Sequence, residues 1–146
     1  MELESFLPYR LAVLAEAVSR SMAQVYAERH RLSRDEWRVL AALSGVPAVR
    51  TAAVIARTTL DKVSVSRALA RLESRGLIER TSDPEDGRGY LIRLLPAGRA
   101  LFRKIVPTVQ AREQFLLEGL SAEERALLES VLDKLLQRAR QLAEHG

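Results

Sequence analysis

The residues best suited to chemistry are basic and hydroxyl side chains that lie close together near the middle of the chain. Within ten residues the sequence places Lys62, Ser64, Ser66, Arg67 and Arg71. If this stretch is a helix, Ser64, Arg67 and Arg71 share one face through their spacing of three and four residues. Hydroxyl groups near a helix start, together with longer cations, can reach base edges and phosphates in the major groove of DNA. This stretch is therefore the first candidate for a nucleic-acid contact.

The positive charge of the chain is concentrated in the same region. The sequence carries 23 Lys and Arg against 19 Asp and Glu, a formal net charge of +4. Residues 47–100 hold ten of the basic and six of the acidic residues, which accounts for the whole excess. A solvated surface could explain such a charge run, but its coincidence with the basic helix favours a polyanionic partner such as double-stranded DNA.

Other kinds of functional site have little support in the sequence. The chain has 2 His and no Cys, and it contains neither a G-x-S-x-G motif nor a phosphate-binding loop. No group of His, Asp and Glu has the spacing of metal ligands. We therefore predict no enzyme, no metal and no other cofactor, and we exclude control by cysteine oxidation.

The sequence also predicts no contact with a membrane. No apolar run approaches the roughly 18–20 residues that a membrane-spanning helix requires. The N-terminus, MELESFLPYR, is acidic at its start and lacks the basic-then-apolar order of a signal peptide. The expected location is the cytoplasm.

Two helices and a hairpin are predicted in the middle of the chain. A short helix has Thr51 as its expected N-cap, and Asp61 is placed as the N-cap of the helix that carries the basic residues. Gly76 suits the left-handed position after this helix. Two short strands follow, separated by the turn-forming segment SDPEDGRG, and they cover residues 77–81 and 90–94.

Longer helices flank this region on both sides. Apolar residues recur at helical spacing from Pro8 to Arg29, and a capping box of Ser33 and Glu36 begins the next helix. After the hairpin, a helix is expected from Pro96 to Glu118.

The C-terminal part adds a possible bend and an unusually apolar helix. Pro107 is expected to kink the helix that contains it. Ser121 and Glu124 form a second capping box before the last helix. The apolar stripe of that helix is too long to face water, so it must be covered by the first helix, by a partner chain or by both.

Taken together, the pattern predicts a mainly α fold with a small β-hairpin wing, a winged helix-turn-helix. The segments LSRDEWRVLAAL, LDKVSVSRALARLESRGLIER and DPEDGRGYLIRLLPAGR resemble the core of the MarR family of bacterial repressors in order and spacing. The match runs from Leu32 to Arg99 and includes the D-x-R sequence of the wing. One departure is Leu94-Leu95 where the family has Leu-Thr, so the Thr N-cap is lost and Pro96 compensates only in part.

The resemblance implies a homodimer in the bacterial cytoplasm, located at the nucleoid while it is bound to DNA. Residues 1–31 and 97–146 would form the dimerisation helices, and residues 32–96 the DNA-binding lobe. The basic helix would enter the major groove and the hairpin tip an adjacent minor groove. A two-fold dimer predicts an inverted-repeat, pseudo-palindromic operator of roughly 16–20 base pairs.

The residues expected to act in this docking come from both helices of the motif and from the wing. We expect Asp86 to hold an arginine or to cap the wing turn rather than to touch DNA. The candidate DNA contacts are Thr51, Lys62, Ser64, Ser66, Arg67, Arg71 and Arg88.

Many MarR relatives release DNA when a small aromatic or phenolic acid binds between the dimer helices and the DNA-binding lobe. An anionic ring needs a cation and a flat apolar wall, the kinds of group that Arg38 and Trp37 offer. Consecutive helical residues point about 100° apart, however, so these two need not line one cavity. The candidate effector-binding residues are Arg20, Trp37 and Arg38, followed by Tyr9, Arg10 and His30.

Structural roles are open for the same residues. Trp37 can be a core residue at the helix junction. Arg20 and Arg38 can form ion pairs at the surface or at an interface, and His30 can be a cation at a helix end.

Two further functions are open. A winged helix can bind another protein instead of DNA, because fold does not fix function. That function predicts binding with little salt dependence, whereas phosphate contacts predict a steep fall in affinity with salt. The chain could also be a DNA-binding regulator without an effector, or an activator.

Overall fold

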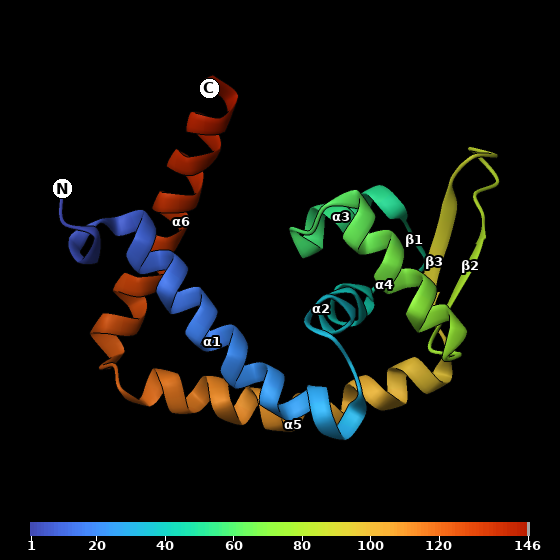
Figure 1. Cartoon of the computed structure of the whole chain (residues 1–146), viewed down its shortest axis with the longest axis horizontal. Helices are drawn as coiled ribbons and strands as arrows, with labels where there is room; N and C mark the ends of the chain where they lie inside the picture. Colours follow the sequence, from blue (N-terminus) through green and yellow to red (C-terminus); the bar gives the residue numbers. More distant parts are fainter. Residues whose placement is uncertain (146) are drawn as a thin grey trace. The chain divides into compact units, whose positions relative to one another are not determined.

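The computed structural model describes residues 1–145, which form two compact units, Met1–Val109 and the residues from Gln110 onward. The fold is mainly helical with one small sheet, as predicted, and the boundary between the units falls within α5. The elements, labelled in Figure 1, are η1 (Leu3–Ser5), α1 (Leu7–His30), α2 (Arg34–Leu43), β1 (Val49–Arg50), α3 (Thr51–Thr58), α4 (Lys62–Ser74), β2 (Ile78–Ser82), β3 (Tyr90–Leu94), α5 (Pro96–Glu118) and α6 (Ala122–His145).

Local capping signals place several helix starts correctly. The Ser33 hydroxyl accepts a hydrogen bond from the Glu36 backbone N–H (3.1 Å), and the Glu36 carboxylate accepts one from the Ser33 N–H (3.2 Å). Ser121 and Glu124 form the same reciprocal pair before α6. Both boxes satisfy backbone donors that have no partner within the first turn of a helix. Pro96 is the first residue of α5, as expected.

The predicted N-cap at Thr51 is wrong. Arg50 is the N-cap of α3, with extended backbone and no side-chain cap bond, and Thr51 is the first helical residue. The physical reason is that Val49 and Arg50 form a short strand that pairs with β3. The chain therefore stays extended as far as Arg50 and enters the helix directly afterwards.

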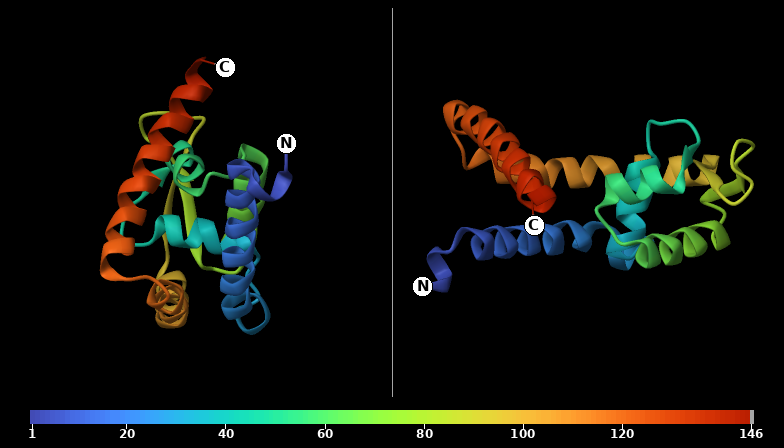
Figure 2. Two further views of the ribbon diagram at one scale, coloured as in Figure 1. Left: turned by 90° about the vertical axis from the view of Figure 1, so that its left-hand side faces the viewer. Right: turned by 90° about the horizontal axis from the view of Figure 1, so that it is seen from above.

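The sheet has three antiparallel strands in the order β1-β3-β2, one more than the sequence predicts. β2 and β3 form the expected hairpin, with Ile78 opposite Leu94 and Ser82 opposite Tyr90. β1 has two residues, too few to show any alternation of apolar and polar side chains. Figure 1 and Figure 2 both show the hairpin tip at the end of the first unit far from the start of α1.

The hydrophobic core lies in the first unit and joins the three helices of the motif to the sheet and to α5. Val65, Ala68, Leu69 and Leu72 are the buried face of α4, and the helical period of the sequence predicts all four. The buried cluster consists of Tyr26, Leu32, Val39, Leu40, Leu43, Val54, Val65, Ala68, Leu69, Leu72, Leu77, Ile78, Ile92, Leu94 and Ile105.

Two glycines allow the chain to turn and to pack closely where α4 meets the sheet. Gly76 has φ +71°, and the Leu77 N–H after it donates to the Leu72 carbonyl (3.0 Å), which ends α4 as predicted. Gly98 lies against the start of β2: a Cβ there would be 2.2 Å from the Leu77 carbonyl oxygen. The first turn of α5 is thereby held against the sheet.

Large apolar side chains are exposed near both ends of the chain. In α1 the predicted apolar stripe is buried only at Tyr26, and no described residue of α6 is buried. The exposed set includes Leu7, Leu11, Leu14, Leu127, Leu128, Val131, Leu132 and Leu136. None of the helices within residues 1–145 combines the length and apolarity needed to cross a membrane. α5 continues through Pro107, and the kink predicted there stays a prediction.

Candidate nucleic-acid interface

The basic helix α4 starts at a side-chain cap that fixes its first turn. The Asp61 carboxylate accepts a hydrogen bond from the Ser64 N–H (2.7 Å) and a second from the Ser64 hydroxyl (2.9 Å). These bonds lower the pKa of Asp61, so the cap is ionised at neutral pH. Ser64 is consequently half-buried in the cap, whereas Ser66 and Arg67 are exposed on the outer side of the helix. Asp61 is thus the N-cap that the sequence predicts.

The ten basic residues between positions 47 and 100 fall into two groups by their contacts. Six donate to an acid or to a backbone carbonyl: Arg50 to Asp83 and Glu85, Arg57 to Ala42, Arg75 to His30 and Arg31, Arg80 to Glu73, Arg93 to Glu79, and Arg99 to Leu94.

The other four basic residues are exposed and make no ion pair with any residue that the structure describes. They are Lys62, Arg67, Arg71 and Arg88, the same four that the sequence selects for DNA contact. Their charges are not neutralised within the fold, so they are available to an external anion. Three belong to α4 and one to the wing tip.

The wing tip is shaped by two carboxylates that accept hydrogen bonds from backbone groups of the turn. Asp83 is buried, and its Oδ1 accepts from the Glu85 N–H (2.9 Å). Asp86 Oδ1 accepts from the Arg88 N–H (3.1 Å), so Asp86 caps the turn, one of the two roles expected for it. Both bonds span two residues, as in Asx turns. The Arg88 side chain is therefore presented from a turn with a defined backbone.

A wing clasp, formed by Arg50 with Asp83 and Glu85, ties the tip to the strand before α3. Arg50 Nε lies 2.7 Å from Asp83 Oδ2, and the Arg50 Nη2 group donates a hydrogen bond to Glu85 Oε2. Hydrogen bonding to the Glu85 N–H, followed by the charge of Arg50, lowers the pKa of Asp83 despite its burial. The clasp therefore holds an ionised carboxylate inside the wing at neutral pH.

Sequence reasoning missed the wing clasp. Arg50 and Asp83 are 33 positions apart, and the two-residue strand that brings them together has no signature of its own. The available signal is the acidic segment beside Arg88, because unpaired acids there would repel phosphate; from it the sequence predicts a holding or capping role for at least Asp86, and no partner at Arg50. Further braces on the hairpin are Arg80 with Glu73 (2.9 Å) and Arg80 over the Tyr90 ring at 5.5 Å.

Trp37 lies in an aromatic stack at the edge of the core. Its ring is 5.3 Å from Tyr26 and 5.5 Å from Phe102, with nearly parallel planes in both cases. The two pairs connect α2 to α1 and to α5. This arrangement fits the structural role for Trp37, that of a residue at the helix junction.

The other effector candidates are spread along α1 and α2. Arg20 is paired with Glu16 (2.8 Å), while Arg38 is half-buried and makes no ion pair within residues 1–145. Tyr9 and His30 belong to the same helix, 21 residues and hence about 30 Å apart, so one small ligand cannot touch both within a chain. Arg10 follows Tyr9 in α1, so it is also far from His30.

His30 is also unsuited to binding an anion at neutral pH. Burial lowers the pKa of its imidazole, and the nearby charges of Lys104, Arg29 and Arg75 lower it further. The ring is therefore neutral at pH 7 and offers no positive charge.

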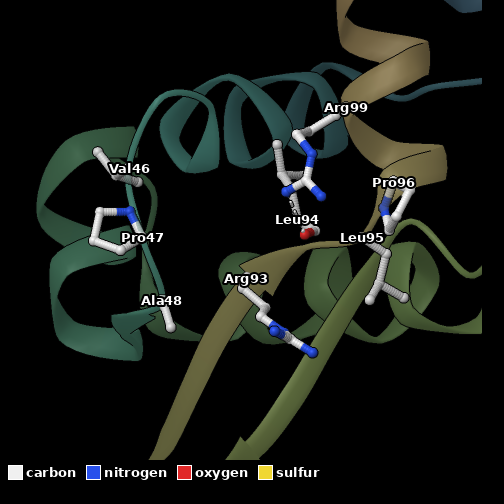
Figure 3. A pocket seen from close by; sticks show the side chains of 8 residues that line it. All are labelled: Val46, Pro47, Ala48, Arg93, Leu94, Leu95, Pro96 and Arg99. Atoms are coloured by element: carbon white, nitrogen blue, oxygen red, sulfur yellow. Dashed lines mark hydrogen bonds between the residues drawn. The ribbon is translucent and has the colours of Figure 1, made fainter.

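A cavity of about 500 Å³ lies between the segment that precedes β1 and the junction of β3 with α5. Figure 3 shows Val46, Pro47 and Ala48 on one side, with Arg93 and Arg99 opposite. Neither arginine is free, since Arg93 pairs with Glu79 and Arg99 donates to the Leu94 carbonyl. None of the effector candidates lines this cavity. A second cavity, about 320 Å³, lies along α1 beside Arg20.

Comparison with known proteins agrees with this geometry. A model of the MarR family matches residues 31–89. The multiple antibiotic resistance protein MarR of Escherichia coli (strain K12) is 37% identical over 95 residues, 60% of this chain and 66% of that protein.

Solved structures of similar proteins match nearly the whole chain. A MarR/EmrR family transcriptional regulator from Acinetobacter sp. ADP1 has a TM-score of 0.86 at 26% identity, covering 97% of this chain and 99% of that one. BpsR of Bordetella bronchiseptica, whose DNA binding is regulated by 6-hydroxynicotinic acid, has a TM-score of 0.82 at 27% identity, covering 92% of this chain and 96% of BpsR. The chain belongs to the MarR family of winged helix-turn-helix transcriptional regulators, which are DNA-binding proteins and not enzymes.

Proposed function

We propose that this regulator is a homodimeric repressor that binds an inverted-repeat operator through α4 and the wing. The observation that carries the proposal is the division of the ten basic residues between positions 47 and 100. Those that are exposed and donate neither to an acid nor to a backbone carbonyl of a described residue all lie on α4 or at the wing tip. Two α4 helices of a two-fold dimer would enter successive major grooves, and the two copies of Arg88 would reach the minor groove. Repression follows from occlusion of the promoter.

The roles proposed for the contact residues differ with their place in the fold. Lys62, Arg67 and Arg71 are long enough for phosphates or guanine edges, and Ser66 offers a short donor beside them. Ser64 acts through the cap it forms with Asp61. Thr51 is proposed to contact a phosphate at the start of α3, whose first N–H groups have no partner within the helix.

The test is fluorescence anisotropy with an operator obtained from the DNA upstream of the protein's own gene, over a range of salt concentrations. We expect tight binding. The logarithm of the association constant should fall by about 0.9 per log unit of salt concentration for each phosphate neutralised. Arg71→Ala should weaken binding and reduce this slope by about two in a dimer, because the contact is made twice. Arg88→Ala should also weaken binding.

Arg93→Ala is the matched control, since Arg93 is exposed in the same lobe but paired with Glu79. It should leave the salt slope unchanged. Binding that is independent of salt and equal in all three variants would favour the alternative of a protein-interaction module.

We propose further that a small aromatic or phenolic acid releases the protein from DNA. The support is the likeness to BpsR together with the half-buried Arg38 beside the aromatic stack. Trp37 is the only tryptophan of the chain, so its emission reports binding near α2 directly.

A panel of aromatic acids should include one that quenches Trp37 emission and lowers operator affinity over the same concentration range. Arg38→Gln should raise the concentration required, and the neutral amide of the same acid should have no effect. An absence of both responses across the panel would favour the second alternative, a DNA-binding regulator without an effector.

A further inference from the structure

The outward face of α4 has an apolar side chain at its centre. Val63 is the second residue of α4 and 58% exposed. The opposite face, formed by residues such as Val65 and Leu69, is buried in the core. At about 100° per residue, Val63 lies roughly 160° around the helix from Val65, so it projects directly away from the lobe.

The neighbours of Val63 on this face are the polar residues already assigned to DNA. Ser66 and Arg67 follow at three and four positions, the spacing that makes helical side chains adjacent, and both are exposed. Ala70, also exposed, continues the same face one turn later. An apolar group is thus surrounded by a hydroxyl and a guanidinium in the first two turns of the helix.

Among residues 1–145, Val63 does not belong to the buried core cluster or to the apolar side chains packed against it. Single exposed apolar residues are common on protein surfaces, so exposure by itself indicates no function. Position gives Val63 its meaning: the first turns of a recognition helix are the part that meets base edges. A β-branched residue also favours a helix less than alanine does, and Val63 remains 58% exposed, so burial compensates for this only in part.

We infer that Val63 is a specificity-determining residue that contacts the 5-methyl group of a thymine in the major groove. Thymine is the only one of the four bases that presents a methyl group there, and apolar side chains recognise it by contact. Ser66 and Arg67 would hold the polar edges and phosphates on either side. This inference rests on the proposed binding of DNA by α4 and adds a base identity to it.

The experiment removes single methyl groups from the DNA. An operator is selected from randomised duplexes with the full-length protein, and each thymine is replaced in turn by deoxyuridine, which differs only in that methyl. At one symmetry-related pair of positions we expect a loss of affinity of about fourfold per half-site, hence about fifteenfold for the pair, from the apolar surface that a methyl buries. Other thymines should tolerate the replacement.

Protein variants connect that methyl to Val63. Val63→Ala should bind the thymine and uracil operators within a factor of two of each other, and Val63→Ile should retain the preference for thymine. Ala56→Gly is the control for a general loss of stability, since Ala56 is at an exposed position of α3. This variant should keep the full preference for thymine over uracil. Val63→Ala should be at least as stable as the wild type in thermal unfolding, because alanine favours a helix more than valine does and Val63 is not among the residues packed against the core cluster.

The outcomes separate this inference from the proposed function. Tight, salt-dependent binding in which replacement of each thymine by deoxyuridine leaves the affinity unchanged would overturn the role of Val63. The proposed binding of DNA would remain intact. The same holds if Val63→Ala keeps the full preference for thymine. Failure to select any duplex would overturn both.

Discussion

Arginines between positions 47 and 100 differ in the contacts that they make. Arg50, Arg80 and Arg93 resemble Arg67 and Arg71 in the sequence, yet each of the first three has a carboxylate within hydrogen-bonding distance. A guanidinium held by an acid is partly neutralised and fixed, whereas a free one keeps its charge and donors for a phosphate or a base. The presence or absence of an acid therefore separates bracing arginines from candidate contact arginines.

The close approach of α5 to the sheet depends on the absence of a side chain at Gly98. Gly98→Ala would place a Cβ 2.2 Å from the Leu77 carbonyl oxygen and 3.1 Å from Leu94 Cδ2, so α5 must move away from the sheet. We expect a loss of about 1–3 kcal/mol in the free energy of unfolding, measured with urea, because backbone atoms cannot give way as a flexible side chain can. Gly87→Ala is the control, since nothing lies within 4 Å of a Cβ there. Equal stability of the two variants would contradict the close packing.

Among the elements, the wing is held by several ion pairs as well as by strand pairing. β2 and β3 are joined by a turn whose tip is rich in acids, and β1 adds only two residues of pairing. The wing clasp and the Arg80–Glu73 pair tether the hairpin to the strand before α3 and to α4. The wing and α4 are thus positioned together, which the proposed simultaneous contact with two grooves would require.

The clasp predicts a dependence of stability on pH. The pKa of Asp83 is lowered in the folded protein, so its contribution is complete above its ordinary pKa near 3.8 and disappears as the pH falls through the lowered value. Asp83→Asn removes the ion pair at every pH. We expect its Tm to lie below that of the wild type at pH 5–8, and the difference to shrink below about pH 4.

Asp133→Asn serves as the control, because Asp133 is exposed and forms no ion pair within the described residues. Its Tm should follow the wild type across the range. A difference for Asp83→Asn that stays constant down to pH 2.5 would mean that the carboxylate charge is not what holds the wing.

For the whole molecule, the apolar residues exposed near both chain ends predict assembly. Leu14 on α1 and Leu132 on α6 are 61% and 50% exposed, and they belong to stripes too extensive for a protein surface in water. A two-fold dimer would cover such surfaces and supply the second recognition helix.

Leu132→Glu should therefore dissociate the dimer, as measured by sedimentation or light scattering at micromolar concentration. Operator affinity should fall by about a hundredfold or more, because the second half-site is no longer bound from the same molecule. Gln137→Glu introduces the same charge at a polar position of α6 and should remain dimeric. A monomeric wild type that binds the operator as tightly would contradict the proposed assembly.

Local features of the sequence determine a large part of this protein. Side chains that bond their own neighbouring backbone set the helix starts at Ser33, Asp61 and Ser121, and Gly76 sets the end of α4. Helical periodicity identifies the buried face of α4, and the turn-forming segment identifies the hairpin. These interactions span only a few residues, so the sequence contains them directly.

Contacts between distant segments are decided only by the tertiary structure. The strand at Val49–Arg50 exists because β3 is present to pair with it, and this pairing displaces the expected cap from Thr51 to Arg50. Whether an arginine is free depends on which carboxylate folds next to it, as Asp83 does for Arg50 across 33 positions. Periodicity places Val63 on the outer face of α4, but only the tertiary structure shows that neither the neighbouring helices nor the wing bury this side chain.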